Sequence, residues 1–219
     1  MSLAISPRPR SWRAPNRSAA PITPFTCAVA PPRSTIVEIR RLALDGLLEI
    51  RPKRFADDRG FFSETWNAAA WREAGIAIDF VQDNHSLSNA RGTLRGLHFQ
   101  APPSAQAKLV RVTRGSAFDV AVDLRSNSPT FRQWAGVILS AAEWNQLLIP
   151  EGFAHGFLTL EADTEVQYKA SAPYDPAADR AINFDDPEIA VEWPLLAANF
   201  VLSDRDRAAP LLADVDTGF

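Results

Sequence analysis

The chain has 219 residues, enough for one domain with a sizeable buried core. Hydrophobic residues make up 46% and charged residues 22%, which excludes a disordered chain, and a net charge of −3 argues against nucleic acid as the main partner. No run approaches the roughly 18 apolar residues that cross a bilayer, so no membrane association is expected. The single cysteine, Cys27, cannot form an internal disulfide, and we expect a soluble, cytoplasmic protein.

The start of the chain differs from the rest. Residues 1–36 contain seven Pro and five Arg and neither Asp nor Glu. Such a stretch buries little apolar surface, so we predict a disordered arm over 1–35 and one folded domain over 36–219. A transit-like peptide, a basic tether and sequence upstream of a misplaced start codon all fit this composition, and we favour the last.

After Ile36, short apolar segments are separated by turn residues, a spacing typical of an all-β sandwich or barrel. We predict strands at 46–55, 61–66, 79–86, 93–100, 108–113, 116–124, 134–140, 146–149, 153–160 and 164–170. The one good helix candidate runs from Asn67 to Ala74, with Asn67 as its cap and Gly75 as its end. Because so many short strands must hide their edges, we predict a jelly roll, in which two sheets enclose a pocket.

The segment 116–124 alternates most regularly. Its bulky residues at 118, 120, 122 and 124 share one face, and its small and acidic residues at 117, 119, 121 and 123 share the other. We expect Asp119 and Asp123 to be solvated or hydrogen-bonded. Gly115 supplies a tight connection to the preceding strand, so 108–113 and 116–124 are predicted to pair as a hairpin.

Rare polar residues concentrate in the predicted strands. The chain has three His and two Tyr, and four of these five lie in polar strand segments. In Leu94-Arg-Gly-Leu-His-Phe-Gln100, a regular strand would put Arg95 and His98 on opposite faces. Arg59 and Arg95 adjoin glycine and aromatic residues, a setting suited to guanidinium groups that bind phosphate. We expect His155 to have a structural or ligand-binding role without transferring protons, and His85 to be structural.

Several kinds of site are not supported. There is no His-x-His pair, so no metal site is predicted. Neither Gly-rich phosphate loop nor a G-x-S-x-G elbow occurs, which argues against nucleotide hydrolases, dinucleotide-dependent redox enzymes and the commonest covalent hydrolases. Of the kinds of chemistry considered, acid–base catalysis by histidine is the one that the sequence still supports.

A neutral imidazole, with an ordinary pKa of about 6.5, removes a proton from carbon only where a ketone acidifies that proton and the resulting charge is held. A lysine such as Lys108 would stabilise the enolate, and a carboxylate such as Asp206 would orient the imidazole. A tyrosine that returns the proton from the opposite face would invert the centre.

The segments that carry these residues match one family together. They are Asp58-Arg-Gly-Phe-Phe62, Phe80-Val-Gln-Asp-Asn-His-Ser86, Leu94-Arg-Gly-Leu-His-Phe-Gln100, Lys108-Leu-Val-Arg111, Ile149-Pro-Glu-Gly-Phe-Ala-His-Gly-Phe157, Tyr168-Lys169, Asp186-Pro187 and Leu202-Ser203 with Asp206. From about Ile36 to about Leu212 the chain resembles the dTDP-4-dehydrorhamnose 3,5-epimerase family. The resemblance implies a homodimer of cupin-like jelly rolls, without a cofactor, that inverts C3 and C5 of dTDP-4-dehydro-6-deoxy-D-glucose.

The resemblance also implies roles for individual residues. His98 would be the base, Tyr168 the acid, Asp206 the partner of His98, and Lys108 the residue that faces the sugar ketone. The substrate site would further include Arg59, Glu64, Gln82, Asp83, Asn84, Arg95, His155, Tyr174, Asp179 and Arg205.

Some positions depart from the family pattern. Asp179 and Arg205 stand where the family commonly has Glu and Lys, and Ala172-Pro173-Tyr174 replaces a more usual pair of tyrosines. The sequence therefore leaves open whether one centre or two is inverted. The alternatives are a 3-epimerase or ketoisomerase of a related dTDP-4-keto sugar, a non-catalytic sugar-binding jelly roll, and a metal-dependent cupin.

Overall fold

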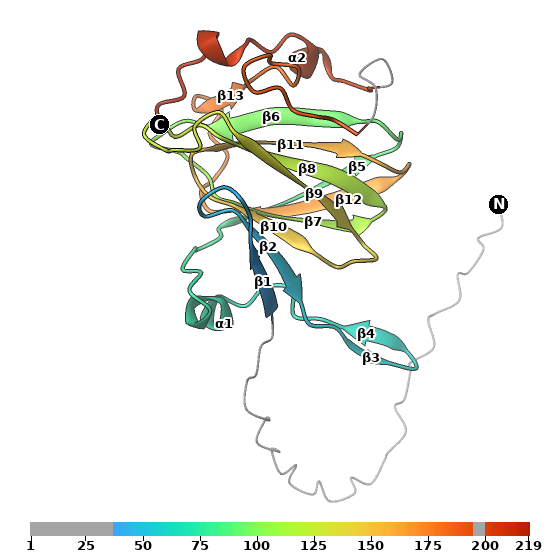
Figure 1. Cartoon of the computed structure of the whole chain (residues 1–219). Coiled ribbons are helices and arrows are strands. Elements are labelled where there is room, and N and C mark those ends of the chain that lie inside the picture. Colours follow the sequence, from blue (N-terminus) through green and yellow to red (C-terminus); the bar gives the residue numbers. More distant parts are fainter. Residues whose placement is uncertain (1–36, 195–199) are drawn as a thin grey trace, which may run out of the picture. The chain divides into compact units, whose positions relative to one another are not determined.

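Two antiparallel sheets lie face to face in the computed structural model, which describes residues 37–194 and 200–219 (Figure 1). The six-stranded sheet has the order β1 (Val37–Arg41), β2 (Leu48–Pro52), β10 (Gln146–Ile149), β7 (Lys108–Arg114), β12 (Thr164–Ala170) and β5 (Gln82–Ser88). The five-stranded sheet has the order β13 (Asp179–Ala181), β6 (Leu94–Gln100), β11 (Phe153–Thr159), β8 (Ser116–Asp123) and β9 (Trp134–Ser140). This is the jelly-roll architecture predicted from the strand spacing. The arm predicted over 1–35 lies outside the described residues.

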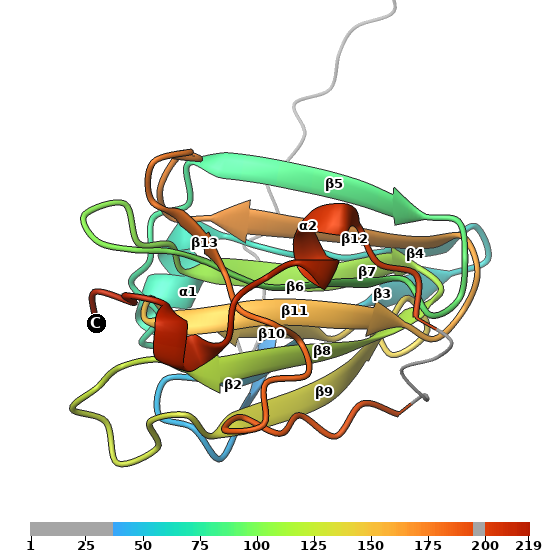
Figure 2. The ribbon, with the colours of Figure 1, turned by 90° about the horizontal axis from the view of Figure 1, so that it is seen from above.

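The remaining elements are short. The strands β3 (Phe55–Asp57) and β4 (Gly60–Phe62) form a hairpin that projects from the two sheets (Figure 1). In the part of the chain that the structure describes, the helices are α1 (Ala68–Glu73) and α2 (Asp204–Arg207), and a 3₁₀ turn lies at Leu212–Asp214. Figure 2 shows α2 lying over β6. No helix in the described part of the chain is long and apolar enough to cross a membrane.

The local predictions are largely confirmed. Each predicted strand segment overlaps an observed strand, although 61–66 forms a strand only as far as Phe62. The helix prediction is confirmed, because Asn67 Oδ1 accepts the N–H groups of Ala69 and Ala70 at 3.1 and 3.2 Å. Gly75 follows the helix with a φ of +89°, a left-handed conformation that favours glycine. The strands β1 and β13 and the helix α2 were not predicted.

The predicted hairpin between 108–113 and 116–124 is wrong. The strand β7 pairs with β10 and β12 in one sheet, whereas β8 pairs with β11 and β9 in the other. Gly115 does turn the chain, with a φ of +74°, but it carries the chain from one sheet to the other. The reason is packing: Val110 and Val112 of β7 meet Ala117 and Ala121 of β8 across the sandwich.

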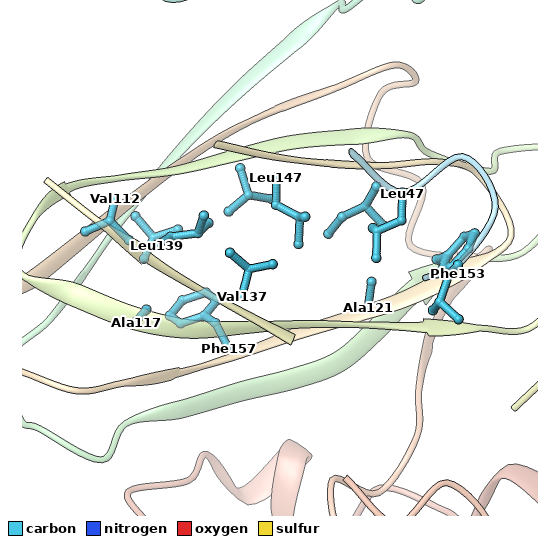
Figure 3. Close-up of a cluster of buried hydrophobic side chains, with 13 residues drawn as sticks. Leu47, Val112, Ala117, Ala121, Val137, Leu139, Leu147, Phe153 and Phe157 are labelled. Atoms are coloured by element: carbon cyan, nitrogen blue, oxygen red, sulfur yellow. The ribbon is translucent and has the colours of Figure 1, made fainter. Parts of the chain in front are cut away.

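The main core fills the space between the sheets (Figure 3). It includes side chains from both sheets, among them Leu147 of β10 and Phe157 of β11. The alternation predicted for 116–124 is confirmed, and its small and acidic face is the one that points into the sandwich. The bulky face, with Val120 and Val122, packs on the outside against the C-terminal segment that includes Ile189 and Leu212. The interior beside β8 therefore keeps room for polar groups.

Candidate active site

A cavity of about 550 Å³ lies between the sheets, where β5 and β12 face β6 and β11. It is closed on one side by residues 201–206, which include the start of α2. The polar side chains along its wall are Ser86, Thr93, Arg95, His98, Gln100, Gln106, Lys108, His155, Tyr168, Tyr174, Asp179, Ser203, Arg205 and Asp206. All four residues assigned to catalysis by resemblance thus line one cavity.

His98 and Asp206 form the closest polar pair in this cavity. His98 Nε2 lies 2.6 Å from Asp206 Oδ1, and the carboxylate is buried, whereas 29% of the imidazole is exposed. Burial raises the pKa of Asp206, but the hydrogen bond and charge of His98, with Ser203 and Arg205, together hold the pKa below its usual value. An ionised Asp206 accepts the Nε2 proton, so Nδ1 is the ring atom left to accept another proton.

Lys108 and Tyr168 share the wall of the six-stranded sheet. Lys108 Nζ lies 5.8 Å from the centre of the Tyr168 ring and 3.5 Å from the carbonyl oxygen of His98. Burial lowers the pKa of Lys108 to about 8, against the opposing effect of Asp119 and Asp179. Burial also raises the pKa of Tyr168, and Asp179 adds to the increase. At neutral pH the phenol therefore keeps its proton, and most of the lysine is cationic.

A second histidine pair lies deeper in the sandwich. His155 Nε2 lies 3.0 and 3.1 Å from the two carboxylate oxygens of Asp119, and both side chains are buried. Of the two environments expected for Asp119, the hydrogen-bonded one is observed. The pair holds the His155 ring in a fixed orientation at the cavity wall.

Arg95 and His98 both line the cavity, and the expectation from a regular strand is wrong. The pairing of β6 with β11 shifts register between His155 and Phe157, so the faces of β6 change over between Arg95 and His98. Gly96 lies at the shift with a φ of +127°. A Cβ atom there would lie 2.5 Å from the Cα atom of Gly156, which only glycine at position 96 avoids.

A hydrogen-bonded network extends from the cavity wall to the start of β5. The Tyr174 hydroxyl donates to Asp179 Oδ2 at 3.1 Å, and Arg205 Nη2 donates to the same oxygen at 2.8 Å. The Tyr174 N–H donates to Gln82 Oε1 at 2.9 Å, and Gln82 Nε2 donates to Asn84 Oδ1 at 3.0 Å. Five of the residues expected in the substrate site thus form one connected group.

Five expected substrate residues do not line the cavity of their own chain: Arg59, Glu64, Gln82, Asp83 and Asn84. Gln82 and Asn84 connect to it only through the hydrogen bonds to Tyr174. Arg59 is 90% exposed at the tip of the β3–β4 hairpin, where it pairs with Asp57, and Glu64 follows β4. Asp83 lies in a separate groove on the outer face of the six-stranded sheet, 2.8 Å from Lys169 Nζ. His85, expected to be structural, lines that groove and pairs with Glu165.

The polar side chains of the cavity are suited to proton transfer. Within residues 37–194 and 200–219, no group of three His, Cys, Asp or Glu side chains is arranged to hold a metal ion. An oriented imidazole, a protonated phenol and a buried ammonium group can remove, return and stabilise charge at one substrate carbon.

Asp119 and Ser203 are among the polar residues in and around the cavity that were not given a role from the sequence. Asp119 falls on the small-residue face of 116–124, and an acid on an inward face needs a partner, which was a usable signal. Ser203 stands three residues before Asp206, and this S-x-x-D spacing is a known signature of a helix start.

The fold and this cavity define a class: a cupin-like jelly roll with a cavity between its sheets that is lined by a histidine–carboxylate pair, a tyrosine and a lysine. The family model described as dTDP-4-dehydrorhamnose 3,5-epimerase matches residues 41–214, and the chain belongs to this family.

Individual relatives agree with this assignment. The dTDP-4-dehydrorhamnose 3,5-epimerase of Pseudomonas aeruginosa is 51% identical over 177 residues, 80% of this chain and 96% of that protein. A crystal structure from Legionella pneumophila, a dTDP-6-deoxy-D-glucose-3,5-epimerase in complex with dTDP-4-keto-L-rhamnose, has a TM-score of 0.78 and 46% identity, and the match covers 82% of this chain and 95% of that one. A 3'-monoepimerase from Streptomyces bikiniensis in complex with dTDP-quinovose is 35% identical, with a TM-score of 0.72 over 78% of this chain and 86% of that one.

Proposed function

We propose that this protein inverts C3 and C5 of dTDP-4-dehydro-6-deoxy-D-glucose to give dTDP-4-dehydro-L-rhamnose. The observation that carries the proposal is the 2.6 Å contact between His98 and Asp206 in a cavity that Lys108 and Tyr168 also line. Family membership supports the choice of substrate, and so does the ligand of the Legionella pneumophila structure.

His98 is the base. With its Nε2 proton bound by Asp206, Nδ1 takes the proton from the carbon beside the C4 ketone, and the charge that forms on the ring is stabilised by the neighbouring carboxylate. The electron pair left by the proton moves into the carbonyl group and makes an enolate. The cationic form of Lys108 stabilises the enolate oxygen.

Tyr168 is the acid. Its raised pKa keeps the phenol protonated until the enolate forms, and donation to the face opposite His98 inverts the centre. The same sequence of steps at the second carbon next to the ketone gives the doubly inverted sugar. Arg95 at the cavity wall binds the pyrophosphate, and the network of Tyr174, Asp179 and Arg205 borders the nucleotide.

The protein acts as a homodimer in this proposal. Figure 1 shows the β3–β4 hairpin at the opposite end of the view from α2, and the hairpin presents Phe61 and Phe62, which are 50% and 71% exposed. A second copy of the chain would cover these rings. The hairpin would carry Arg59, and Glu64 just after it, to the cavity of the partner.

The test follows proton exchange rather than product alone. In heavy water, the wild type should introduce deuterium at C3 and C5 of the substrate. His98→Ala should lower this exchange by at least about 100-fold, because a positioned base contributes that much. Tyr168→Phe should still exchange but fail to form the inverted sugar. Full exchange by folded His98→Ala protein would refute the proposed base, and binding of substrate without exchange by the wild type would indicate a sugar-binding protein.

A second candidate is inversion at C3 alone. It is favoured by the change at Ala172-Pro173 beside Tyr174 and by the similarity to the 3'-monoepimerase from Streptomyces bikiniensis. The NMR spectrum of the product separates the two activities: deuterium and inversion at both carbons support the main proposal, and deuterium at C3 only supports the second.

A further inference from the structure

Ser203 belongs to the motif Leu202-Ser203 with Asp206, but the proposed mechanism assigns it no role. It precedes α2 with φ and ψ of −69° and 160°, and its side chain accepts the N–H of Asp206 at 3.1 Å. The same hydroxyl donates its proton to Asp206 Oδ2 at 2.8 Å. One side chain thus holds both the backbone and the carboxylate of the residue that contacts His98.

With the second of these bonds, each carboxylate oxygen of Asp206 has a hydrogen-bond partner. Oδ1 faces His98 Nε2 at 2.6 Å, and Oδ2 is held by Ser203. The torsion that turns a carboxylate about its own axis is broad, so the side chain by itself does not fix the plane of its oxygens. With Ser203 in place, the plane has one orientation in which Oδ1 points at the imidazole.

The backbone of Asp206 also depends on this contact. The helix α2 has only four residues, too few to be stable alone, so its position relies on side-chain bonds. Within the described residues, the side-chain bonds that hold α2 are the cap from Ser203, the bond from Arg205 to Asp179 and the contact between Asp206 and His98. Ser203 acts directly on Asp206, whereas Arg205 acts from the next residue.

We propose that Ser203 is a positioning residue: it fixes the Asp206 carboxylate so that His98 keeps its proton on Nε2 and leaves Nδ1 free. The role of Nδ1 as the base rests on the proposed function, but the effect on the ring tautomer does not.

Three substitutions separate the two bonds. Ser203→Ala removes both, Ser203→Thr keeps both, and Ser203→Asp keeps the cap acceptor but cannot donate to Asp206. Nitrogen-15 NMR of substrate-free protein reports which ring nitrogen of His98 carries the proton. We expect the Nε2–H form in the wild type and Ser203→Thr, and a mixture of both forms in Ser203→Ala and Ser203→Asp.

Kinetics give the functional effect. Ser203→Ala and Ser203→Asp should lower kcat for deuterium exchange about fivefold, the effect of one hydrogen bond, with KM unchanged. Asn67→Ala, which removes the cap of α1 far from His98 in the sequence, is the matched control for loss of stability without loss of kcat.

Other results would overturn the inference. If His98 in Ser203→Ala keeps the wild-type tautomer, Ser203 is only a helix cap. The same conclusion follows if Ser203→Asp has the wild-type tautomer and kcat. A raised KM with unchanged kcat would make Ser203 a substrate contact. If the wild type itself does not exchange deuterium, the proposed function fails, and the NMR result still decides the role of Ser203.

Discussion

Burial acts in opposite directions on the two ionisable groups that line the six-stranded side of the cavity. It penalises whichever form carries charge, so it lowers the pKa of Lys108 and raises that of Tyr168. A phenol that keeps its proton suits an acid, and a lysine with a pKa of about 8 is still mainly cationic at neutral pH. The same desolvation therefore prepares the site for catalysis and makes the folded state less stable than an apolar wall would.

That cost is measurable at a single residue. Lys108→Met should raise the free energy of unfolding at pH 7 by up to about 3 kcal/mol, because the pKa falls from 10.5 in the unfolded chain to about 8. The unfolded state binds more protons between these pH values, so wild-type stability rises with pH there and the advantage of methionine disappears above about pH 10.5. Urea unfolding at pH 7 and pH 10 checks this, and a destabilised methionine variant would contradict it. Epimerase activity should be lost.

At the scale of elements, a buried carboxylate organises the loop that follows β8. Asp123 is fully buried and accepts hydrogen bonds from Arg125 at 2.8 Å and from Ser128 and Thr130 at 2.6 Å. Burial raises the pKa of Asp123, but these donors outweigh it and hold the pKa at about 2. The loop is therefore tied to the end of a core strand by charge and hydrogen bonds.

Asp123→Asn should lower the free energy of unfolding by about 2 kcal/mol at neutral pH, the value of a shift from 3.8 to about 2. Because the folded pKa is depressed, the wild-type contribution is present above pH 4 and is lost as the pH falls towards 2. Chemical unfolding of both proteins at pH 7 and pH 3 should show the difference shrinking. Glu143→Gln, on an exposed pair with Arg51, is the control and should change little.

At the scale of the whole molecule, Arg59 is separated from the cavity of its own chain, so in the proposed dimer the site would depend on assembly. Arg59 is 90% exposed on a projecting hairpin, whereas His98 lies in the cavity. If the partner's Arg59 completes each site, one defective chain can be rescued by a different defective chain.

Arg59→Ala and His98→Ala should each be inactive as homodimers. When the two variants are co-expressed in equal amounts, half of the dimers are mixed and each has one intact site, so activity should return to about a quarter of the wild-type value. Tagged purification of the mixed dimer and the deuterium exchange assay measure this. No recovery in a confirmed mixed dimer would show that Arg59 serves its own chain.

Local signals determined most of the elements. Two-residue alternation predicted strands such as β8, and Asn67 with Gly75 predicted α1, because both depend on neighbours a few residues away. The strand β13 has three residues without an apolar pattern and exists through its pairing with β6, so it left no such signal. The residue types of the catalytic group were evident in the sequence, and their assignment to particular positions came from family resemblance.

Tertiary structure decided which strands pair and which side chains meet. The turn at Gly115 is compatible with a hairpin and with a crossover, and only the meeting of apolar faces across the sandwich selects the crossover. Likewise, Asp206 lies 108 residues after His98, and it reaches the ring because α2 lies over β6 and Ser203 holds its carboxylate. Periodicity describes the environment of one segment, whereas pairing and site geometry depend on the packing of distant segments. For this reason the sequence by itself determined the elements and the chemistry available, and the fold determined where that chemistry is assembled.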